Sequence, residues 1–531
     1  MSGLTSTTVG HRLTELALRE PDHNVLSIGS HWVTLKELNE RTDRLSAGLA
    51  SLGIGHGDRV ALVLPNCMAA AETIFACAKL GAIAVPLNAY LKGEFLRYQL
   101  HDADPSVACL DASAAEALAG LNLDLTGLKA TIGVGQFDGS DSRTDIGYEE
   151  LLTTGYDTPT VPVRPQDPLA IFYTSGTTGM PKGCLIAHGY AFNGARAHYH
   201  FGHTREDDVI ATALPLFHAA AFSSMMDTIG GVRCAISLET EFRASTFLSR
   251  ARDKGATVIR GVGAMGVALL GTTPSDADRE HSIERAHFFP LGSEMREAFE
   301  QRFGIAMISG GYGQTECNPA VHTSYEDRHQ PTAGRALPWI ELRIVDDEDN
   351  ELPTGQVGEI VLRNKEPYGL FSGYWRKESA TLESSRNLWH HTGDYGRLDD
   401  AGYLTFVDRK KDALRRRGEN VSSIELEKAI LAHPTVRQVA VHAVASEVTE
   451  DDIKACIVLA ENAAISPQEL FDFFEKSLPY YAIPRYVEVM DQLPENAVSR
   501  VQKHILRARG NGPGVWDFEE LGMVVRRDHR R

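Results

Sequence analysis

Short apolar runs alternate with amphipathic helical stretches along this chain. Residues 35–52 carry apolar side chains at helical spacing and stop at Gly53, and residues 69–80 repeat the pattern. Apolar runs at 59–64 and 82–87 have the length of buried strands. Strands that alternate with helices build sheets with helices packed on their faces. The sequence therefore predicts an α/β protein.

The length of the chain and the character of its C-terminal third predict two domains. With 531 residues the chain exceeds the usual size of a single core. The elements expected in the last third are a hairpin, a strand, a helix, a strand and a helix, at 342–363, 402–408, 424–434, 436–444 and 466–478. We predict a large N-terminal domain of packed mixed sheets and helices, residues 1–410, and a small C-terminal α/β domain, residues 411–531. The boundary is expected near Lys410–Lys411.

The charge balance excludes one class of partner. The chain has 53 Lys and Arg against 71 Asp and Glu, a formal net charge of −18. Nucleic-acid binding depends on clustered basic side chains, so we expect no nucleic-acid partner. Small anionic ligands respond to local charge instead, and residues 408–417 carry six basic and two acidic side chains. A small anionic ligand therefore remains compatible with this composition.

Cysteine usage and hydropathy predict the compartment. The seven cysteines are scattered and include no C-x-x-C pair, which indicates reduced thiols in the cytoplasm. Arg12, Glu15 and Arg19 fall where a signal peptide would need an apolar region. No apolar run approaches the roughly 20 residues that span a bilayer. We expect a cytoplasmic protein without a transmembrane segment; an oligomer is compatible with the sequence.

The most informative segment is the run Tyr173–Gly183, YTSGTTGMPKG, which lies between two apolar strands. Its glycines allow the backbone to approach an anion, and its hydroxyls and N–H groups can surround phosphate oxygens. Lys182 adds a mobile positive charge. The run lacks the Gly-Lys-Ser/Thr of the Walker loop, and a loop of such composition could also be a simple hairpin turn. Eleven specified positions in a row favour a phosphate-binding loop.

Three further segments are ambiguous when taken alone. Residues 310–316, GGYGQTE, offer an aromatic face, a hydroxyl and a carboxylate that suits a hard cation such as Mg²⁺. Residues 391–394, HTGD, contain an aspartate suited to ribose hydroxyls. Residues 408–420 combine DRKKD with RGEN. Each is also typical of an exposed turn, so only their combination carries an inference.

Taken in order, these segments resemble the adenylate-forming superfamily of acyl-CoA synthetases, luciferases and peptide-synthetase adenylation domains. The resemblance extends from about Thr34 to Arg507. It rests on the motifs GDRVALVLPN, YTSGTTGMPKG, LPLFH, YGQTE, AGRALP, GYW, TGD, DRKKD and GENVSSIELE. The wording is most similar to acyl-CoA ligases of the crotonobetaine/carnitine-CoA ligase type.

The resemblance implies an ATP-dependent carboxylate–CoA ligase that uses ATP, Mg²⁺ and coenzyme A. It would convert an organic acid to an acyl-AMP and pass the acyl group to CoA, and the small domain would be mobile. The ATP-binding residues it implies are Thr174, Ser175, Gly176, Thr177, Thr178, Gly179, Lys182, Gly311, Tyr312, Thr315, Asp394 and Arg409. Glu316 would bind Mg²⁺, and His218 would lie at the wall between the carboxylate and thiol sites. Lys411 would be the hinge, and Arg417, Gly418, Glu419 and Asn420 would meet CoA.

One position departs from the family pattern. The lysine that orients the carboxylate and the α-phosphate in the family is replaced here by Arg500, which follows Ser499. Arginine can supply the same charge as a bidentate fork, so we assign this catalytic role to Arg500. Two alternatives stay open: Lys503 takes over the role, or adenylation is impaired and the chain is a non-catalytic member of the family. A third reading keeps adenylation but loads the acyl or aminoacyl group onto a carrier protein.

Three further segments bear on the substrate pocket and on metal binding. Residues 261–266, GVGAMG, match the dinucleotide fingerprint, but we expect their small side chains to make a roomy acyl pocket instead. Residues 287–290, HFFP, replace a small-residue motif of the family and are expected to reshape the acyl or adenine wall. His198, His200 and His203 lack a Cys or carboxylate to complete a metal set, so we expect a surface or packed cluster.

Overall fold

A computed structural model of the chain shows two compact units, which are treated separately here. The first comprises residues 1–342, 362–390 and 399–405, and the second comprises 343–361, 391–398 and 406–531. The structure describes residues 3–91, 93–119, 121, 127–135, 144–154, 160–174, 180–231, 233–410, 414–416, 419–421, 423–445, 451–478, 482–495 and 501–523. The predicted boundary near Lys410–Lys411 remains a prediction.

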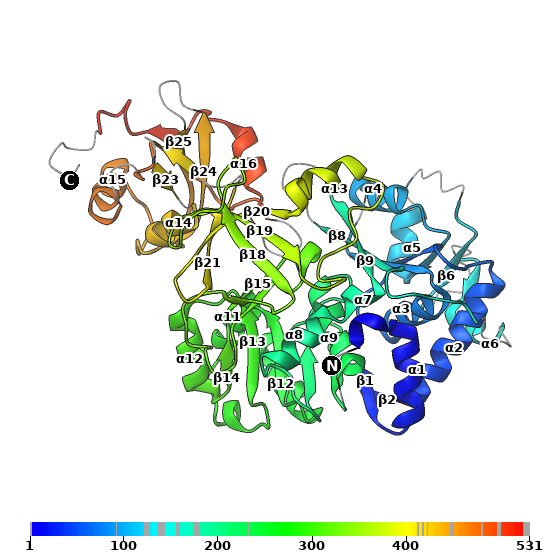
Figure 1. Ribbon diagram of the computed structural model, residues 1–531. Helices are drawn as coiled ribbons and strands as arrows, with labels where there is room; N and C mark the ends of the chain where they lie inside the picture. Colours follow the sequence, from blue (N-terminus) through cyan, green and yellow to red (C-terminus); the bar gives the residue numbers. More distant parts are fainter. Residues whose placement is uncertain are drawn as a thin grey trace. The chain divides into compact units, whose positions relative to one another are not determined.

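Two seven-stranded sheets form the framework of the first unit (Figure 1). One sheet has the order β14 (Ala306–Ile308), β13 (Arg285–Phe289), β12 (Val258–Val262), β10 (Val209–Thr212), β11 (Ala235–Leu238), β1 (Asn24–Ile28) and β2 (His31–Thr34). The other has the order β7 (Ile146–Gly147), β6 (Ala130–Gly133), β5 (Val107–Leu110), β3 (Arg59–Val63), β4 (Ile83–Leu87), β8 (Pro168–Thr174) and β9 (Lys182–Ala187). Strands pair in parallel except at β1–β2 and β8–β9, so each sheet is mixed.

Helices α2 (Leu35–Ser51) and α3 (Met68–Leu80) confirm the helical stretches predicted at 35–52 and 69–80, and eleven further helices accompany them in the described part of this unit. These are α1 (Val9–Arg19), α4 (Gly93–Ala103), α5 (Ala112–Ala119), α6 (Tyr148–Thr154), α7 (His188–Ala191), α8 (Asn193–His200), α9 (Ala219–Gly230), α10 (Ala244–Asp253), α11 (Gly263–Leu270), α12 (Ser293–Phe303) and α13 (Glu378–Ser384). Short 3₁₀ turns are η1 (Leu4–Ser6), η2 (Asp276–Arg279), η3 (Thr315–Cys317) and η4 (Arg386–Leu388). Helix α2 begins with a capping box between Thr34 and Glu37, and α3 ends at Gly81 with a positive φ of 66°.

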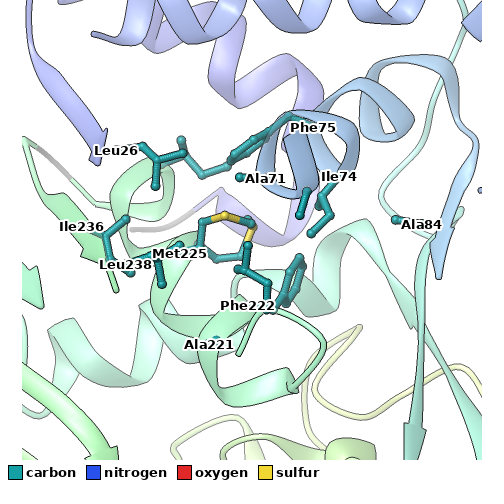
Figure 2. Close-up of a cluster of buried hydrophobic side chains, with 14 of the residues drawn as sticks. Leu26, Ala71, Ile74, Phe75, Ala84, Ala221, Phe222, Met225, Ile236 and Leu238 are labelled. Atoms are coloured by element: carbon teal, nitrogen blue, oxygen red, sulfur yellow. The ribbon is translucent and has the colours of Figure 1, made fainter. Parts of the chain in front are cut away.

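The main core of the first unit lies between its two sheets. Figure 2 shows Ala71, Ile74 and Phe75 of α3 and Phe222 and Met225 of α9 gathered with side chains of β1 and β11. The Phe222 ring lies 5.2 Å from that of Phe172 on β8, which belongs to the other sheet. Because both faces of these sheets are covered, their strands read as nearly continuous apolar runs.

A third seven-stranded sheet has the order β15 (Gly311–Tyr312), β16 (Val321–His322), β17 (Gly334–Ala336), β21 (Tyr403–Arg409), β20 (His390–Leu398), β19 (Gly358–Asn364) and β18 (Ile340–Val345). The neighbouring strands β18 and β19 confirm the hairpin predicted at 342–363. The division between the units falls inside β18, β19, β20 and β21. The pairs β15–β16–β17 lie entirely in the first unit.

The second unit carries its own α/β core. A four-stranded sheet has the order β24 (Val436–Ala445), β25 (Asp451–Leu459), β26 (Tyr486–Val489) and β27 (Val515–Asp517), with a separate pair β22 (Leu414–Arg416) and β23 (Glu419–Val421). Side chains of α14 (Ser423–Leu431) and α15 (Pro467–Ser477) join one apolar cluster with Val441 and Ile453, and Leu506 of α16 (Lys503–Arg509) joins another with Ala440 and Cys456. Alternate residues of β24 therefore face two different helical layers.

These observations confirm the predicted α/β class with a large N-terminal unit and a smaller C-terminal one. All seven cysteines are free, and Cys67 alone among them is not fully buried. Within the described part of the chain, no helix is both long and apolar enough to cross a bilayer.

Candidate active site

The phosphate-binding loop predicted at Tyr173–Gly183 connects two paired strands. Strands β8 and β9 are antiparallel, with Tyr173 opposite Gly183 and Thr174 opposite Lys182, and the Thr174 hydroxyl donates to the Lys182 carbonyl at 3.3 Å. The ladder therefore fixes the two ends of the loop at one strand end. The predicted residues Ser175, Gly176, Thr177, Thr178 and Gly179 lie outside the described residues.

The turn η3 presents the predicted metal ligand. Tyr190 of α7 donates its hydroxyl to the Thr315 carbonyl at 2.8 Å and accepts from the Asn318 amide at 2.6 Å. The Phe371 amide donates to the Glu316 carbonyl at 2.9 Å. Three hydrogen bonds from two distant segments thus hold a turn that makes little regular structure of its own.

The Glu316 side chain is buried, and its carboxylate has no basic partner among the described residues. Its Oε1 accepts a hydrogen bond from the Tyr374 hydroxyl at 2.7 Å. In the part of the chain that the structure describes, no basic nitrogen lies within 4.0 Å of this carboxylate. A buried carboxylate without a cation is costly, and carboxylate oxygens are ligands that Mg²⁺ prefers. Glu316 therefore fits a magnesium ion.

The same carboxylate affects a neighbouring thiol. Burial is the main cause that raises the pKa of the Cys184 thiol well above its usual value, and the Glu316 carboxylate raises it further. Cys184 on β9 therefore stays a neutral thiol beside the anion.

A short segment that pairs with β9 completes the surroundings of Glu316. Residues Gly373–Trp375 lie along β9: the Leu185 amide donates to the Gly373 carbonyl at 2.9 Å, and the Trp375 amide donates to the Gly183 carbonyl at 2.8 Å. This arrangement brings the Tyr374 ring to 4.9 Å from Lys182 Nζ. The structure thus brings Thr174, Lys182 and Glu316 into one hydrogen-bonded and cation–π-linked neighbourhood.

The predicted adenine-binding strand packs closely against its surroundings. In β15, Tyr312 is buried, and a Cβ added to Gly311 would lie 3.4 Å from His322 Nδ1 and 3.7 Å from the Phe289 ring. At Gly310 an added Cβ would lie 1.9 Å from the Thr323 hydroxyl oxygen. Phe289, in the segment that departs from the family pattern, therefore stands beside the predicted nucleotide strand.

His218 precedes α9 as its N-cap residue. Solvent reaches its side chain, yet the surrounding protein lowers the pKa of the imidazole below its ordinary value. Its role at the wall between the carboxylate and thiol sites remains a prediction.

Asp394 and Arg409 belong to the second unit. Asp394 is buried, its amide donates to the Thr392 hydroxyl at 3.2 Å, and Arg409 Nε lies 4.0 Å from its carboxylate. The Arg409 amide donates to Asp408 at 2.7 Å, and Asp408 also accepts from the Ser423 amide at 2.7 Å. The two predicted ribose-binding side chains are thus close to each other.

The contacts of Lys503 bear on which residue supplies the catalytic positive charge. Its Nζ donates to the Ser423 hydroxyl at 2.6 Å and lies 2.7 Å from the Glu427 carboxylate, and its side chain is mostly buried. The Lys503 amine is thus engaged by two partners within the second unit, and the assignment of the catalytic role to Arg500 remains a prediction. Arg500, Lys411, Arg417 and Gly418 lie outside the described residues. Glu419 and Asn420 are described only as backbone of β23.

The predicted roomy pocket at residues 261–266 is wrong. A Cβ added to Gly261 would lie 2.6 Å from the Phe288 ring, and one added to Gly263 would lie 1.9 Å from the Pro290 carbonyl oxygen. At Gly266 the Phe288 ring would again be 3.1 Å away. These glycines allow the end of β12 and helix α11 to pack closely against Phe288 and Pro290, and their missing side chains do not leave open space.

The histidines expected to form a surface or packed cluster are packed in the interior at two of three positions. His198 and His203 are buried, whereas His200 is exposed. They adjoin two histidines distant in sequence: the ring of His203 lies 4.5 Å from that of His287 and 4.6 Å from that of His322. Sequence reasoning missed this larger cluster because His287 and His322 come from strands that are distant in the sequence from His198 and His203.

The comparisons with known proteins agree with this geometry. The profile of the family described as AMP-binding enzyme matches residues 13–375, and that of the AMP-binding enzyme C-terminal domain matches residues 425–500. A crotonobetaine/carnitine–CoA ligase of Salmonella paratyphi B is 32% identical over 489 residues, covering 88% of this chain and 92% of that protein.

Two solved structures of one protein are similar over nearly the whole chain. O-succinylbenzoate coenzyme A synthetase from Bacillus subtilis, in complex with its acyl-adenylate intermediate, shares 27% identity at a TM-score of 0.81, covering 95% of this chain and 99% of that chain. The same synthetase in complex with ATP and a magnesium ion shares 26% identity at a TM-score of 0.79, covering 94% and 99%.

Proposed function

The chain belongs to the AMP-binding enzyme family, and we propose that it activates a carboxylic acid with ATP and transfers the acyl group to coenzyme A. The enzyme is an AMP-forming acid–thiol ligase that uses ATP, Mg²⁺ and CoA. The structural observation that carries this function is the buried Glu316 carboxylate, which has no basic nitrogen within 4.0 Å among the described residues and has Tyr374 as a neighbour in common with Lys182. A cation ligand and a phosphate-binding cation at one place suit a magnesium–nucleotide substrate.

The reaction requires the approach of two anions. The substrate carboxylate attacks the α-phosphorus of ATP, pyrophosphate leaves, and the CoA thiol then attacks the acyl-adenylate to yield a thioester and AMP. When bound, Mg²⁺ neutralises charge on the phosphates. Lys182 supplies a positive charge that is already in place when the substrates bind. The site therefore reorganises little as negative charge shifts toward pyrophosphate.

We assign the remaining roles as follows. Thr174 and the loop residues up to Gly179 surround the β- and γ-phosphates, Tyr312 stacks on adenine beside Gly311, and Thr315 contacts the α-phosphate. Asp394 and Arg409 bind the ribose. His218 lines the wall between the carboxylate and thiol sites, Arg500 orients the carboxylate, Lys411 is the hinge at the domain boundary, and residues 417–420 meet CoA. The free thiols support a cytoplasmic location.

The function is tested by pyrophosphate release over a panel of carboxylic acids, with and without CoA. The relatives' names direct the panel toward betaines and aromatic acids with a second carboxylate. We expect at least one acid to release pyrophosphate with Mg²⁺ and to form AMP and a thioester only when CoA is present. Glu316→Gln is the matched control, which should reduce pyrophosphate release. Adenylation that CoA never discharges, but that an acyl carrier protein does, would replace this function by carrier loading.

A further inference from the structure

Tyr374 joins the two charged groups that the proposed function assigns to the magnesium–nucleotide substrate. Its hydroxyl donates to Glu316 Oε1 at 2.7 Å, and the centre of its ring lies 4.9 Å from Lys182 Nζ. Glu316 and Lys182 make no direct ion pair within 4.0 Å in the described chain. The side chain of one tyrosine thus contacts both the anion and the cation.

The backbone around Tyr374 is held on both sides. Tyr374 stands opposite Cys184 in a β-bridge, its amide donates to the Thr381 hydroxyl at 2.9 Å, and its ring lies 4.9 Å from that of Phe371. The phenol is half-buried, so its orientation is fixed by packing as well as by hydrogen bonds. A side chain fixed in this way can orient its partners.

The chemistry of each contact suits a different ligand. The Tyr374 hydroxyl donates its hydrogen to Glu316 Oε1 and so does not compete with the carboxylate for a cation. Donation to Oε1 fixes the rotation of the carboxylate and leaves Oε2 for a metal ion. The face of an aromatic ring attracts an ammonium without neutralising it, so Lys182 keeps its charge for a phosphate.

We propose that Tyr374 is a positioning residue for the magnesium–ATP complex: its hydroxyl orients Glu316 toward the metal ion and its ring holds Lys182 toward the phosphates. This inference rests on the proposed function, because it takes Glu316 and Lys182 as the ligands of that substrate. The sequence motifs assign no role to Tyr374, although it is the tyrosine of the GYW segment.

The test separates the hydroxyl from the ring with two variants and needs no acid or CoA. Tyr374→Phe removes only the hydroxyl, and Tyr374→Leu removes the ring as well. Mn²⁺ replaces Mg²⁺, and its binding in the presence of ATP is counted by electron paramagnetic resonance. ATP binding in EDTA is measured by calorimetry. Tyr368→Phe is the matched control, because its hydroxyl faces Gln166 at 3.4 Å in the same unit.

We expect Tyr374→Phe to weaken Mn²⁺ binding about tenfold, as outer partners of metal ligands commonly do, and to leave metal-free ATP binding unchanged. Tyr374→Leu should in addition weaken metal-free ATP binding by about threefold or more. Tyr368→Phe should match the wild type in both measurements. Unchanged Mn²⁺ binding by a folded Tyr374→Phe protein would overturn the role of the hydroxyl, and unchanged ATP binding by Tyr374→Leu would overturn that of the ring.

A double variant tests whether Tyr374 acts through Glu316. In a Glu316→Gln background, Tyr374→Phe should cause no further loss of Mn²⁺ binding; an added tenfold loss would contradict the inference. Full Mn²⁺ binding by Glu316→Gln alone would overturn both the metal site and the role of Tyr374. If no acid supports pyrophosphate release but these binding changes appear, the proposed function fails while the positioning role stands.

Discussion

Two tyrosines hold the acidic turn that faces the proposed nucleotide. Tyr190 fixes the backbone on both sides of Glu316 through Thr315 and Asn318, and Tyr374 fixes its carboxylate. Both phenols have a pKa raised by burial, so both remain neutral donors. Glu316 is therefore oriented by neutral groups, which leaves its charge available for a cation.

The cation of the first half-reaction is predicted to be Arg500. Because the role requires charge near the carboxylate and the α-phosphate, Arg500→Ala should abolish acyl-AMP formation but retain thioester formation from supplied acyl-AMP. Pyrophosphate release and thioester formation are measured separately. Arg500→Lys serves as the conservative control and should restore part of the first step. An unaffected first half-reaction in Arg500→Ala would show that another residue supplies this charge.

At the scale of elements, strand–helix pairs were readable because their signals are local. The capping box of α2 and the glycine that ends α3 stand at the predicted ends of these helices. In the small unit, α14, β24 and α15 lie where their periodicity places them. Apolar spacing reports which face an element buries, so it predicts elements well even when their partners are unknown.

The glycines at 261–266 show what apolar spacing does not predict. Glycines occur both where a pocket needs open space and where two elements pack closely. The sequence of residues 261–266 is compatible with either arrangement. The positions of Phe288 and Pro290 decide for close packing. Phe288 lies in β13 and Pro290 directly follows this strand, and the segment at 271–284 separates them from α11 in the sequence.

This packing predicts the effect of adding one methyl group. Gly263→Ala would place a Cβ 1.9 Å from the Pro290 carbonyl oxygen, so α11 or the end of β13 must shift. We expect a loss of about 1–3 kcal/mol in stability, measured as a lower melting temperature. Gly271→Ala at the other end of α11 is the control, because its φ is −73° and its nearest atoms lie at 3.5 Å. Equal melting temperatures for both variants would contradict this account.

At the scale of the whole molecule, buried histidines link stability to pH. Burial lowers the pKa of His322 to about 3 and that of His188 to about 4, and those of His203 and His287 lie well below 6.5. Arg260, which pairs with Asp227 at 2.7 Å, adds positive charge beside the cluster. Below about pH 6.5 these histidines therefore bind protons in the unfolded chain, whereas in the folded chain they stay neutral until the pH falls to their lowered pKa values.

Stability should thus be fully present above pH 6.5 and fall as the pH drops toward these lowered values. Within this window each such histidine lowers the free energy of unfolding by about 1.4 kcal/mol for every unit by which the pH falls. The measurement is the melting temperature between pH 7.5 and 5, with His287→Gln as a variant whose slope should be smaller by one proton. A melting temperature that stays constant from pH 7 to pH 5 would refute the linkage.

The sequence by itself determined the α/β class, the positions of many elements and the family. These properties depend on local periodicity and on motifs of consecutive residues, which are readable without knowing what packs against them. Only the tertiary structure decided that the glycines at 261–266 serve close packing and that four histidines form one buried cluster. It alone brought Tyr374 to Glu316 and Lys182, because such contacts join segments that are far apart in the chain.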